Sequence, residues 1–235
     1  MKAQHGLKDC VTCPIRGQAV VCDLTDDEAA EFHAIKHVFR YEPRQTVFYE
    51  GHACLGLYVL CVSRVKLTRS SVTGRRQIVG LLDAGEVIEK HAFMEQGLHT
   101  VTCETLEPSQ ACMIEREPYL AILRQNSGLA LRLLGLLSNE VGRQMDQFDR
   151  LAFMTARQRL AGLLVEMVDR FGGRKNGEHP VGIALTREEV AELAGVAVET
   201  AIRLLSAFRR EELVRVEGRQ ITLLRPERLA RIARR

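Results

Sequence analysis

The sequence predicts an α+β protein in which an antiparallel β-roll is followed by a long helix and a winged helix-turn-helix. Short runs rich in β-branched and aromatic residues, punctuated by turn residues, fill positions 38–118. Apolar residues then recur at helical spacing, and two short helices joined by a glycine-containing turn are expected near the C-terminus. The expected parts are an arm at 1–23, the roll at 24–118, the long helix at 119–152 and the winged helix-turn-helix at 153–235.

Composition and charge predict a globular protein without a membrane span and with a basic C-terminal part. The chain has 235 residues, of which 46% are hydrophobic, enough to build a core. No apolar run is long enough for a membrane span, and the N-terminus lacks a signal peptide, so we expect a cytoplasmic protein without a membrane partner. Residues 150–235 carry 17 Lys and Arg against 11 Asp and Glu, whereas the rest carry 16 against 19. This asymmetry indicates either a nucleic-acid-binding appendage or a solvated Arg-rich surface.

The arm carries three cysteines, Cys10, Cys13 and Cys22. In the cytoplasm thiols stay reduced, so such a group favours metal binding or redox chemistry over structural disulfides. The chain has seven cysteines, an odd number that fits a complete disulfide framework poorly.

The first expected helix covers residues 24–35, with Thr25 as its N-cap and Glu28 completing a capping box. The strands of the roll are predicted from short runs of β-branched and aromatic residues, which have typical strand length and are separated by turn residues. These runs lie at 46–50, 55–62, 64–72, 76–82, 101–107 and 110–115.

An a/d-like rhythm marks the long helix. Its expected seam consists of Leu134, Leu137, Val141, Gln144, Phe148 and Leu151. Such a seam predicts a coiled-coil contact between two copies of the chain, in which Gln144 sets the register. The alternative is a helix packed on its own β domain, because periods of 3.5 and 3.6 residues cannot be separated over so short a stretch.

The C-terminal part holds the clearest pattern. A helix at 155–173 precedes a short helix capped by Thr186, and Gly195 supplies the turn to a second helix that starts near Val198. Leu205 and Phe208 are expected to face inward, with Ile202 beside them. Two strands around Glu217 and Gly218 form the wing.

The second helix of such a motif presents its N-terminal residues to base edges in the major groove. Those residues are Ala197, Glu199, Thr200 and Arg203. Arginine donates two hydrogen bonds to guanine and glutamate accepts one from cytosine, although Glu199 and Arg203 could instead form an i, i+4 ion pair. The expected phosphate partners are Arg209, Arg210, Arg215 and Arg219.

Enzyme motifs are not found. The sequence holds no Gly-rich phosphate loop, no HExxH and no nucleophile elbow, and its histidines form no recognised metal-site motif. We therefore expect a protein that is not an enzyme.

A β-roll, a long helix and a winged helix-turn-helix in this order resemble the Crp–Fnr family of bacterial transcription regulators, whose roll is of the cyclic-nucleotide-binding type. The local sequences that carry the resemblance lie at 198–205, 158–163 and 105–115 and in the cysteine cluster, and they are most similar to the oxygen-sensing branch, the fumarate-nitrate reduction regulators. The resemblance implies a homodimer that binds a palindromic TTGAT-like site in double-stranded DNA, with RNA polymerase as a further partner.

In that branch three arm cysteines and one roll cysteine hold an oxygen-labile iron–sulfur (4Fe–4S) cluster. The resemblance assigns this role to Cys10, Cys13, Cys22 and Cys112, with Cys103 as the rival fourth ligand. Cys54 and Cys61 are expected to be small core residues. Without the resemblance, four thiolates favour tetrahedral zinc. A regulator of the same fold that senses nitric oxide, a haem ligand or thiol redox state is the alternative.

Two departures from the family matter. The cyclic-nucleotide branch needs an Arg-Ser or Arg-Thr pair after Gly85 and Glu86, and none follows here, so cAMP is not expected as a cofactor. In the recognition helix Ile202 stands where the oxygen-sensing branch has serine. That side chain could contact a thymine methyl group or face the core.

Overall fold

The computed structural model describes residues 10–19, 22, 24–88, 97–172 and 178–234. The chain forms two compact units, one of Met1–Gly74 with Val79–Gly142 and the other of Arg75–Ile78 with Arg143–Arg235. The main division thus falls within the longest helix, between Gly142 and Arg143. Each unit is described by itself. The predictions for residues 1–9, 20–21, 23, 89–96, 173–177 and 235 lie outside the described residues. These residues include parts of the arm and part of the segment after Glu86 that lacks the Arg-Ser or Arg-Thr pair.

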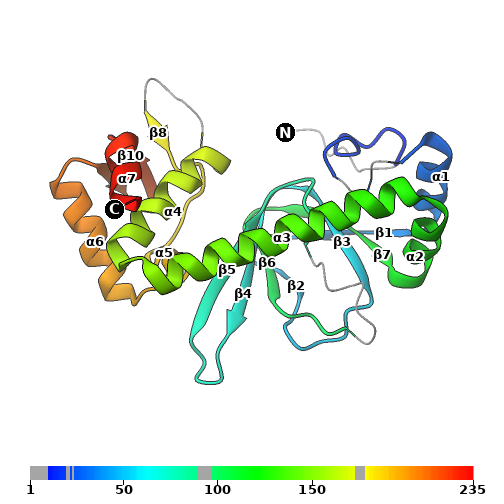
Figure 1. Ribbon diagram of the computed structural model, residues 1–235, viewed down its shortest axis with the longest axis horizontal. Helices are drawn as coiled ribbons and strands as arrows, with labels where there is room; N and C mark the ends of the chain where they lie inside the picture. Colours follow the sequence, from blue (N-terminus) through cyan, green and yellow to red (C-terminus); the bar gives the residue numbers. More distant parts are fainter. Residues whose placement is uncertain (1–9, 20–21, 23, 89–96, 173–177, 235) are drawn as a thin grey trace. The chain divides into compact units, whose positions relative to one another are not determined.

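The first unit opens with α1 (Asp26–Ile35), whose N-terminus carries the predicted capping box of Thr25 and Glu28. Two antiparallel sheets follow and form the predicted roll (Figure 1). One has the strand order β1-β7-β3 and the other β2-β6-β4-β5. The strands are β1 (Lys36–Tyr41), β2 (Thr46–Phe48), β3 (Gly56–Val62), β4 (Val65–Ser70), β5 (Arg76–Leu82), β6 (Thr102–Thr105) and β7 (Ser109–Glu115).

The predicted single helix at 119–152 is wrong in its first part, because the chain forms two helices there. These are α2 (Arg116–Gln125) and α3 (Ser127–Phe153), and Asn126 separates them with a non-helical backbone. The side chain of Asn126 accepts a hydrogen bond from the backbone N–H of Leu129 at 2.8 Å and donates one to Glu28. It therefore caps α3 and connects it to the start of α1.

The two faces of α3 differ. Leu129 and Leu133 are buried in the core of the first unit, and Leu136 and Leu137 pack partly against it. Burial of one leucine side chain contributes about 1.5–3 kcal/mol. Of the predicted seam, Leu137 therefore lies partly against the roll, whereas Leu134, Val141, Gln144, Phe148 and Leu151 are exposed. Leu131 and Met145 add to this exposed apolar surface.

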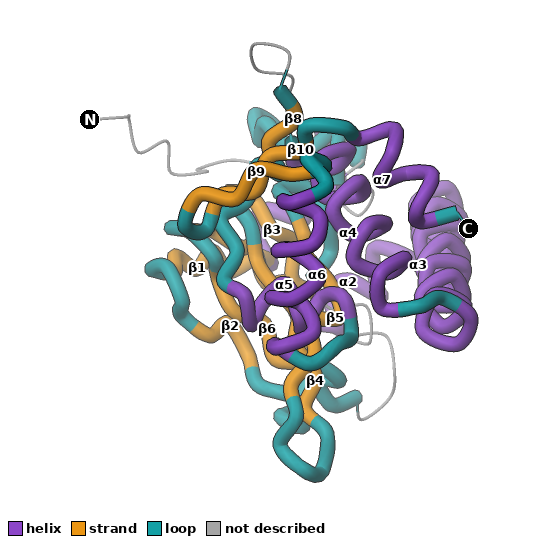
Figure 2. Tube along the Cα trace, turned by 90° about the vertical axis from the view of Figure 1, so that its left-hand side faces the viewer, coloured by secondary structure: helices purple, strands orange, loops and turns teal. Residues whose placement is uncertain are grey.

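The second unit packs its helices against a small three-stranded sheet that lies at one edge of the unit (Figure 2). The sheet has the order β8-β10-β9, and β9 and β10 form the predicted wing. The elements are α4 (Ala156–Phe171), β8 (His179–Pro180), α5 (Arg187–Ala194), α6 (Val198–Arg210), β9 (Val214–Glu217), β10 (Gln220–Leu223) and α7 (Pro226–Ala233). No helix in the described ranges has both the length and the apolar character needed to cross a membrane.

Replacing Asn126 with alanine removes the cap of α3 and the bond to Glu28. We expect Asn126→Ala to lower the free energy of unfolding by about 1–2 kcal/mol in urea denaturation, because the freed N–H groups lose their acceptor. Asn139→Ala, an exposed change within the same helix, is the control. Equal stability of the two variants would contradict the capping role.

Candidate functional site

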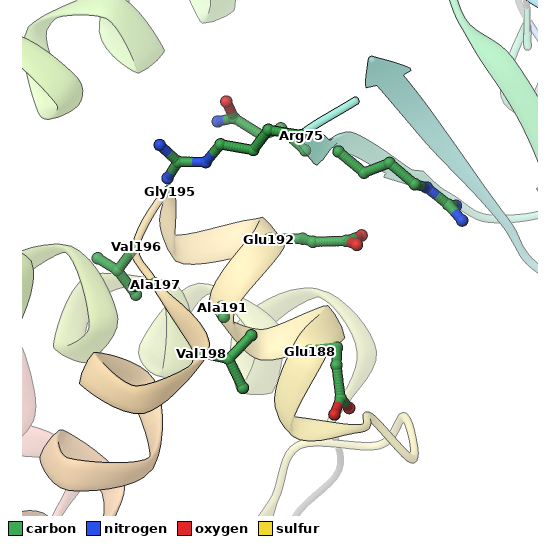
Figure 3. A pocket seen from close by; sticks show the side chains of 10 residues that line it. Arg75, Glu188, Ala191, Glu192, Gly195, Val196, Ala197 and Val198 are labelled. Atoms are coloured by element: carbon green, nitrogen blue, oxygen red, sulfur yellow. The ribbon is translucent and has the colours of Figure 1, made fainter. Parts of the chain in front are cut away.

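The turn between α5 and α6 depends on Gly195. Its backbone is left-handed, at φ 63° and ψ 39°, a conformation that residues with a Cβ atom rarely adopt. A Cβ atom there would also come within 2.9 Å of the Leu151 side chain. Figure 3 shows Gly195, Val196, Ala197 and Val198 leading from α5 into α6. The chain thus makes the short turn that a helix-turn-helix requires.

The recognition helix α6 buries one face and exposes the other. Ala201, Leu205 and Phe208 are buried, as predicted for the last two. The expectation that Ile202 joins them is wrong, because its side chain is 45% exposed. Position 202 directly follows the buried Ala201, and a step of one residue turns the helix by about 100°.

Four further predicted DNA contacts lie on the same helix. Glu199, Arg203 and Arg209 are exposed, and Thr200 is half-buried. In the described part of the chain no ion pair joins Glu199 to Arg203, so the two side chains do not occupy each other. Arg215 differs, because it pairs with Glu178 at 2.6 Å and with Glu217 at 3.5 Å. Its charge is already balanced by Glu178, which directly precedes β8, and by Glu217 of the wing.

Arg159 of α4 holds the helix-turn-helix in place, a role that sequence patterns do not reveal. Its guanidinium donates to the carbonyl oxygens of Met154 at 2.7 Å, Ala194 at 2.9 Å and Gly195 at 3.2 Å. These carbonyls lie at the ends of two helices, where backbone acceptors have no partner within the helix. One side chain therefore fixes the turn relative to α4.

The second candidate site lies in the first unit, where the described residues 10–19 of the arm form a series of turns. Backbone hydrogen bonds run from Cys13 to Cys10 and from Cys22 to Ala19. Arg16 closes the arm by donating to the carbonyl oxygens of Val11 and Leu24 and to Asp26, the last at 2.8 Å. Ile15, Ala19 and Leu24 are buried in the same core as Leu129 and Leu133.

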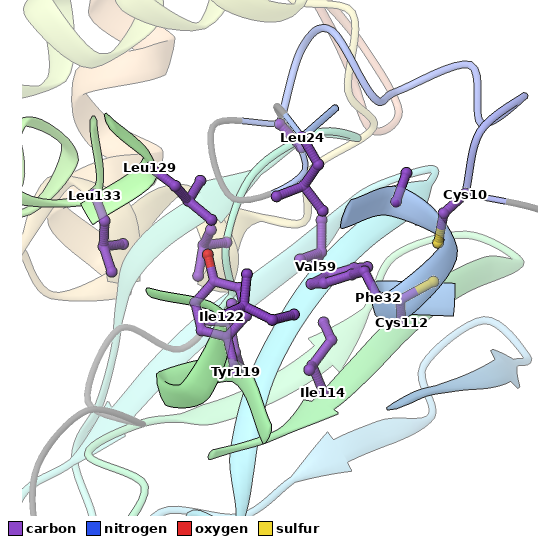
Figure 4. Packing of buried hydrophobic residues seen from close by; sticks show 14 of the residues in the cluster. Cys10, Leu24, Phe32, Val59, Cys112, Ile114, Tyr119, Ile122, Leu129 and Leu133 are labelled. Carbon is purple, nitrogen blue, oxygen red and sulfur yellow. The ribbon is translucent and has the colours of Figure 1, made fainter. Parts of the chain in front are cut away.

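Five cysteines line one pocket in this unit, and we call it the cysteine pocket. They are Cys10, Cys13, Cys22, Cys61 and Cys112, and the remaining walls are mostly apolar, with Lys36 as the charged member. Figure 4 shows the side chains of Cys10 and Cys112 pointing toward each other from the arm and from β7. The structure therefore brings together the four cysteines predicted as ligands.

The other cysteines separate into two groups. Cys103 is fully buried in a different core cluster, together with Phe48 and Leu60, so it does not share the pocket. Cys54 is buried in the first cluster without lining the pocket. Cys61 is buried as predicted, but its sulfur lies 3.2 Å from that of Cys112. Sequence reasoning missed this contact because it depends on the pairing of β3 with β7.

The pocket shifts the acidity of its thiols. Burial raises the pKa of Cys22, and the sulfurs of Cys13 and Cys10 raise it further. Burial also raises the pKa of Cys10, although a hydrogen bond from Lys36 opposes this. The hydrogen bond that Cys61 donates to Cys112 lowers the pKa of Cys112 and raises that of Cys61, because it stabilises the charged acceptor.

The chemistry of these donors suits a soft metal centre, because five thiols from the arm and the sheet, among them the four predicted ligands, line one mostly apolar space. In the residues that the structure describes, however, no three His, Cys, Asp or Glu side chains are arranged as they would be around a bound metal ion. The cysteines therefore fit a soft metal centre by their residue type and by their shared pocket. Their side chains are not arranged in metal-binding geometry.

Comparison with known proteins identifies a domain family in each of the two units. Residues 158–232 match the Crp-like helix-turn-helix domain and residues 38–126 match the cyclic nucleotide-binding domain. The chain belongs to the Crp–Fnr family. It is accordingly a DNA-binding transcription regulator and not an enzyme.

Individual relatives agree with this assignment. The chain is 29% identical to the transcriptional activator protein FnrL of Cereibacter sphaeroides, over 91% of this chain and 87% of the relative. It is 28% identical to a CRP-like cAMP-activated global transcriptional regulator of Mycobacterium tuberculosis, over 80% and 84%. The solved structure of FixK2 from Bradyrhizobium japonicum has the same fold, with a TM-score of 0.71 at 23% identity, covering 84% of this chain and 97% of that one.

Replacing Arg159 with methionine keeps the aliphatic stem and removes three charged hydrogen bonds. We expect Arg159→Met to lower the free energy of unfolding by about 2 kcal/mol and to weaken DNA binding, because the turn loses its support. The control is Arg157→Met on the same helix, which breaks the exposed ion pair with Glu211 and is expected to cost less. A larger loss of stability in the control would refute the role given to Arg159.

Proposed function

We propose that this protein is a cytoplasmic, homodimeric regulator whose binding to palindromic DNA responds to oxygen through a 4Fe–4S cluster. The observation that supports this proposal is the shared pocket of Cys10, Cys13, Cys22 and Cys112. The three arm cysteines come from a loop and the fourth from a strand far away in the sequence. Such a cluster needs four thiolate ligands, and when bound it supplies an oxygen-labile iron–sulfur centre.

The arm and α3 are connected through the core of the first unit. Ile15 and Leu24 of the arm share that core with Leu129 and Leu133 at the start of α3. A change in the packing of the arm therefore changes the support of the helix that carries the proposed dimer seam. We propose that oxygen acts on dimerisation, and hence on DNA binding, through this connection.

The proposed seam is the exposed apolar side of α3, formed by Leu134, Val141, Phe148 and Leu151, with Gln144 between them. Leu137 contributes to its edge, because this side chain is partly used by the core. Phe148 is 65% exposed in one copy of the chain, and a second copy would cover it. Dimerisation sets the spacing of two recognition helices, which explains the need for a palindromic site.

In the proposed complex Glu199, Thr200 and Arg203 read base edges and Arg209 contacts phosphate. Ile202, which is exposed on the same face, contacts a thymine methyl group in place of the serine usual in the oxygen-sensing branch. RNA polymerase is a proposed further partner. We also propose that cAMP is not a ligand, because no Arg-Ser or Arg-Thr pair follows Glu86.

Iron and labile sulfide analysis of protein purified without oxygen tests the cluster. We expect iron and sulfide in the full-length chain, and loss of both in Cys13→Ala and in Cys112→Ala, because each removes one of four ligands. The same two variants are expected to lose oxygen-responsive gel retardation of a TTGAT-type palindrome. Their oligomeric state before and after exposure to air is measured by analytical ultracentrifugation.

Cys54→Ala is the matched control, because it removes a buried thiol of the same core that does not line the pocket. It is expected to keep iron, sulfide and the response to oxygen. Equal behaviour of all three variants would contradict the ligand assignment. Stoichiometric zinc without iron, or a haem Soret band, would replace the cluster with one of the alternative sensors.

Two arginines of α6 are expected to behave differently in DNA binding. Arg203→Ala should cost about 1–3 kcal/mol on the preferred site and relax the preference at one base pair, because a base contact is lost. Arg209→Ala should weaken binding to all sequences and reduce the slope of log affinity against log salt by about 1. Binding is measured by fluorescence anisotropy at several salt concentrations, and the same loss on every sequence for both variants would overturn the base-reading role of Arg203.

A further inference from the structure

Cys61 is the member of the cysteine pocket that the proposed ligand set does not use. It lies on β3, whose neighbour β7 carries Cys112. Across this strand pair Val59 is the direct partner of Cys112, and side chains two residues apart on a strand point to the same face. The side chain of Cys61 therefore lies on the pocket side of the sheet.

A bulge brings the two sulfurs together. Leu60 pairs with Ala111 and Val62 with Gln110, so Cys61 is an extra residue on β3 with no partner of its own in the register. A bulge of this kind bends the strand and redirects a side chain. Here the Cys61 thiol contacts the Val59 carbonyl oxygen at 3.5 Å and the Cys112 sulfur at 3.2 Å.

We propose that Cys61 and Cys112 form a reversible disulfide when the metal-free protein meets a hydroperoxide, which makes this strand pair a second redox site. The two sulfurs are only about 1.2 Å farther apart than the bonded atoms of a disulfide. Both residues are free thiols, and both line the cysteine pocket.

The reaction balances with one molecule of hydrogen peroxide. The Cys112 sulfur gives up its proton and attacks one peroxide oxygen, so the O–O bond breaks and a sulfenic acid and water form. The Cys61 sulfur then attacks the sulfenic sulfur, its proton leaves with the hydroxyl group as a second water, and the S–S bond forms. Two thiols are oxidised and one peroxide is reduced.

The disulfide would take Cys112 out of the proposed ligand set. A cysteine bonded to another sulfur cannot act as a thiolate ligand, so the oxidised chain could not take up a cluster until a reductant restores both thiols. Only this consequence rests on the proposed function. The disulfide itself does not depend on the identity of the metal.

The test treats the full-length, metal-free, reduced chain with one equivalent of hydrogen peroxide without air and maps the product by mass spectrometry. Proteolysis after Tyr58 separates Cys54 from Cys61, and proteolysis after Glu104 separates Cys103 from Cys112. We expect two of the seven free thiols to be lost and one linked peptide pair that contains Cys61 and Cys112. Dithiothreitol should separate the pair.

Variants provide the controls. The double variant Cys54→Ala, Cys103→Ala lacks the two buried thiols outside the pocket and should form the same link. Cys61→Ala should not form it, and circular dichroism establishes that this variant is folded. Linkage of Cys112 to an arm cysteine, or unchanged thiols in the unsubstituted chain, would overturn the proposal.

Iron and sulfide uptake separates this proposal from the proposed function. After peroxide treatment the unsubstituted chain should lose its uptake and regain it with dithiothreitol. A link between Cys61 and Cys112 in a chain that never takes up iron supports the disulfide and contradicts the cluster. Iron uptake without any such link supports the cluster and overturns the disulfide.

Discussion

The apolar core of the first unit is the constraint on which the proposed control of this protein depends. One cluster of buried side chains joins the arm, the helix α1, the sheet that carries Cys112 and the first turns of α3. Interiors of this kind are close-packed and transmit displacement instead of absorbing it. The arm can therefore influence α3 without touching its exposed face, because Leu24 and Leu129 occupy the same core (Figure 4).

The cysteine pocket contains groups that shift the pKa values of its thiols in opposite directions. Its walls are mostly apolar, which keeps thiols protonated, and burial raises the pKa of Cys22 and Cys10 accordingly. Lys36 and the thiol of Cys61 act in the other direction, on Cys10 and Cys112 respectively. Of the four proposed ligands, Cys10 and Cys112 are thus the ones whose anionic form is stabilised by a hydrogen bond from a neighbouring side chain.

The sequence predicted local features well where one segment determines them. The capping box at Thr25, the N-cap at Thr186, the strands of the roll and the turn at Gly195 depend on neighbouring residues, and the structure contains all of them. Features that depend on tertiary pairing were missed. The break at Asn126 lies inside a continuous helical pattern, and the strand β1 is recognisable only through its pairing with β7. For the same reason only the family resemblance assigned Cys112 to the ligand set, and nothing in the sequence predicted that Cys61 contacts it.

Arg16 restrains the loop of the arm, and this restraint affects the free energy with which the loop would bind a small ligand. A single guanidinium bridges the backbone at Val11 and Leu24 and the carboxylate of Asp26, so both ends of the cysteine-bearing segment are already fastened together. A loop restrained in this way gives up less conformational freedom when it closes around a small guest, and preorganisation of this kind increases affinity without adding a contact. The guanidinium thus lowers the entropic penalty that the arm would pay on binding the proposed guest, although Arg16 does not itself line the cysteine pocket.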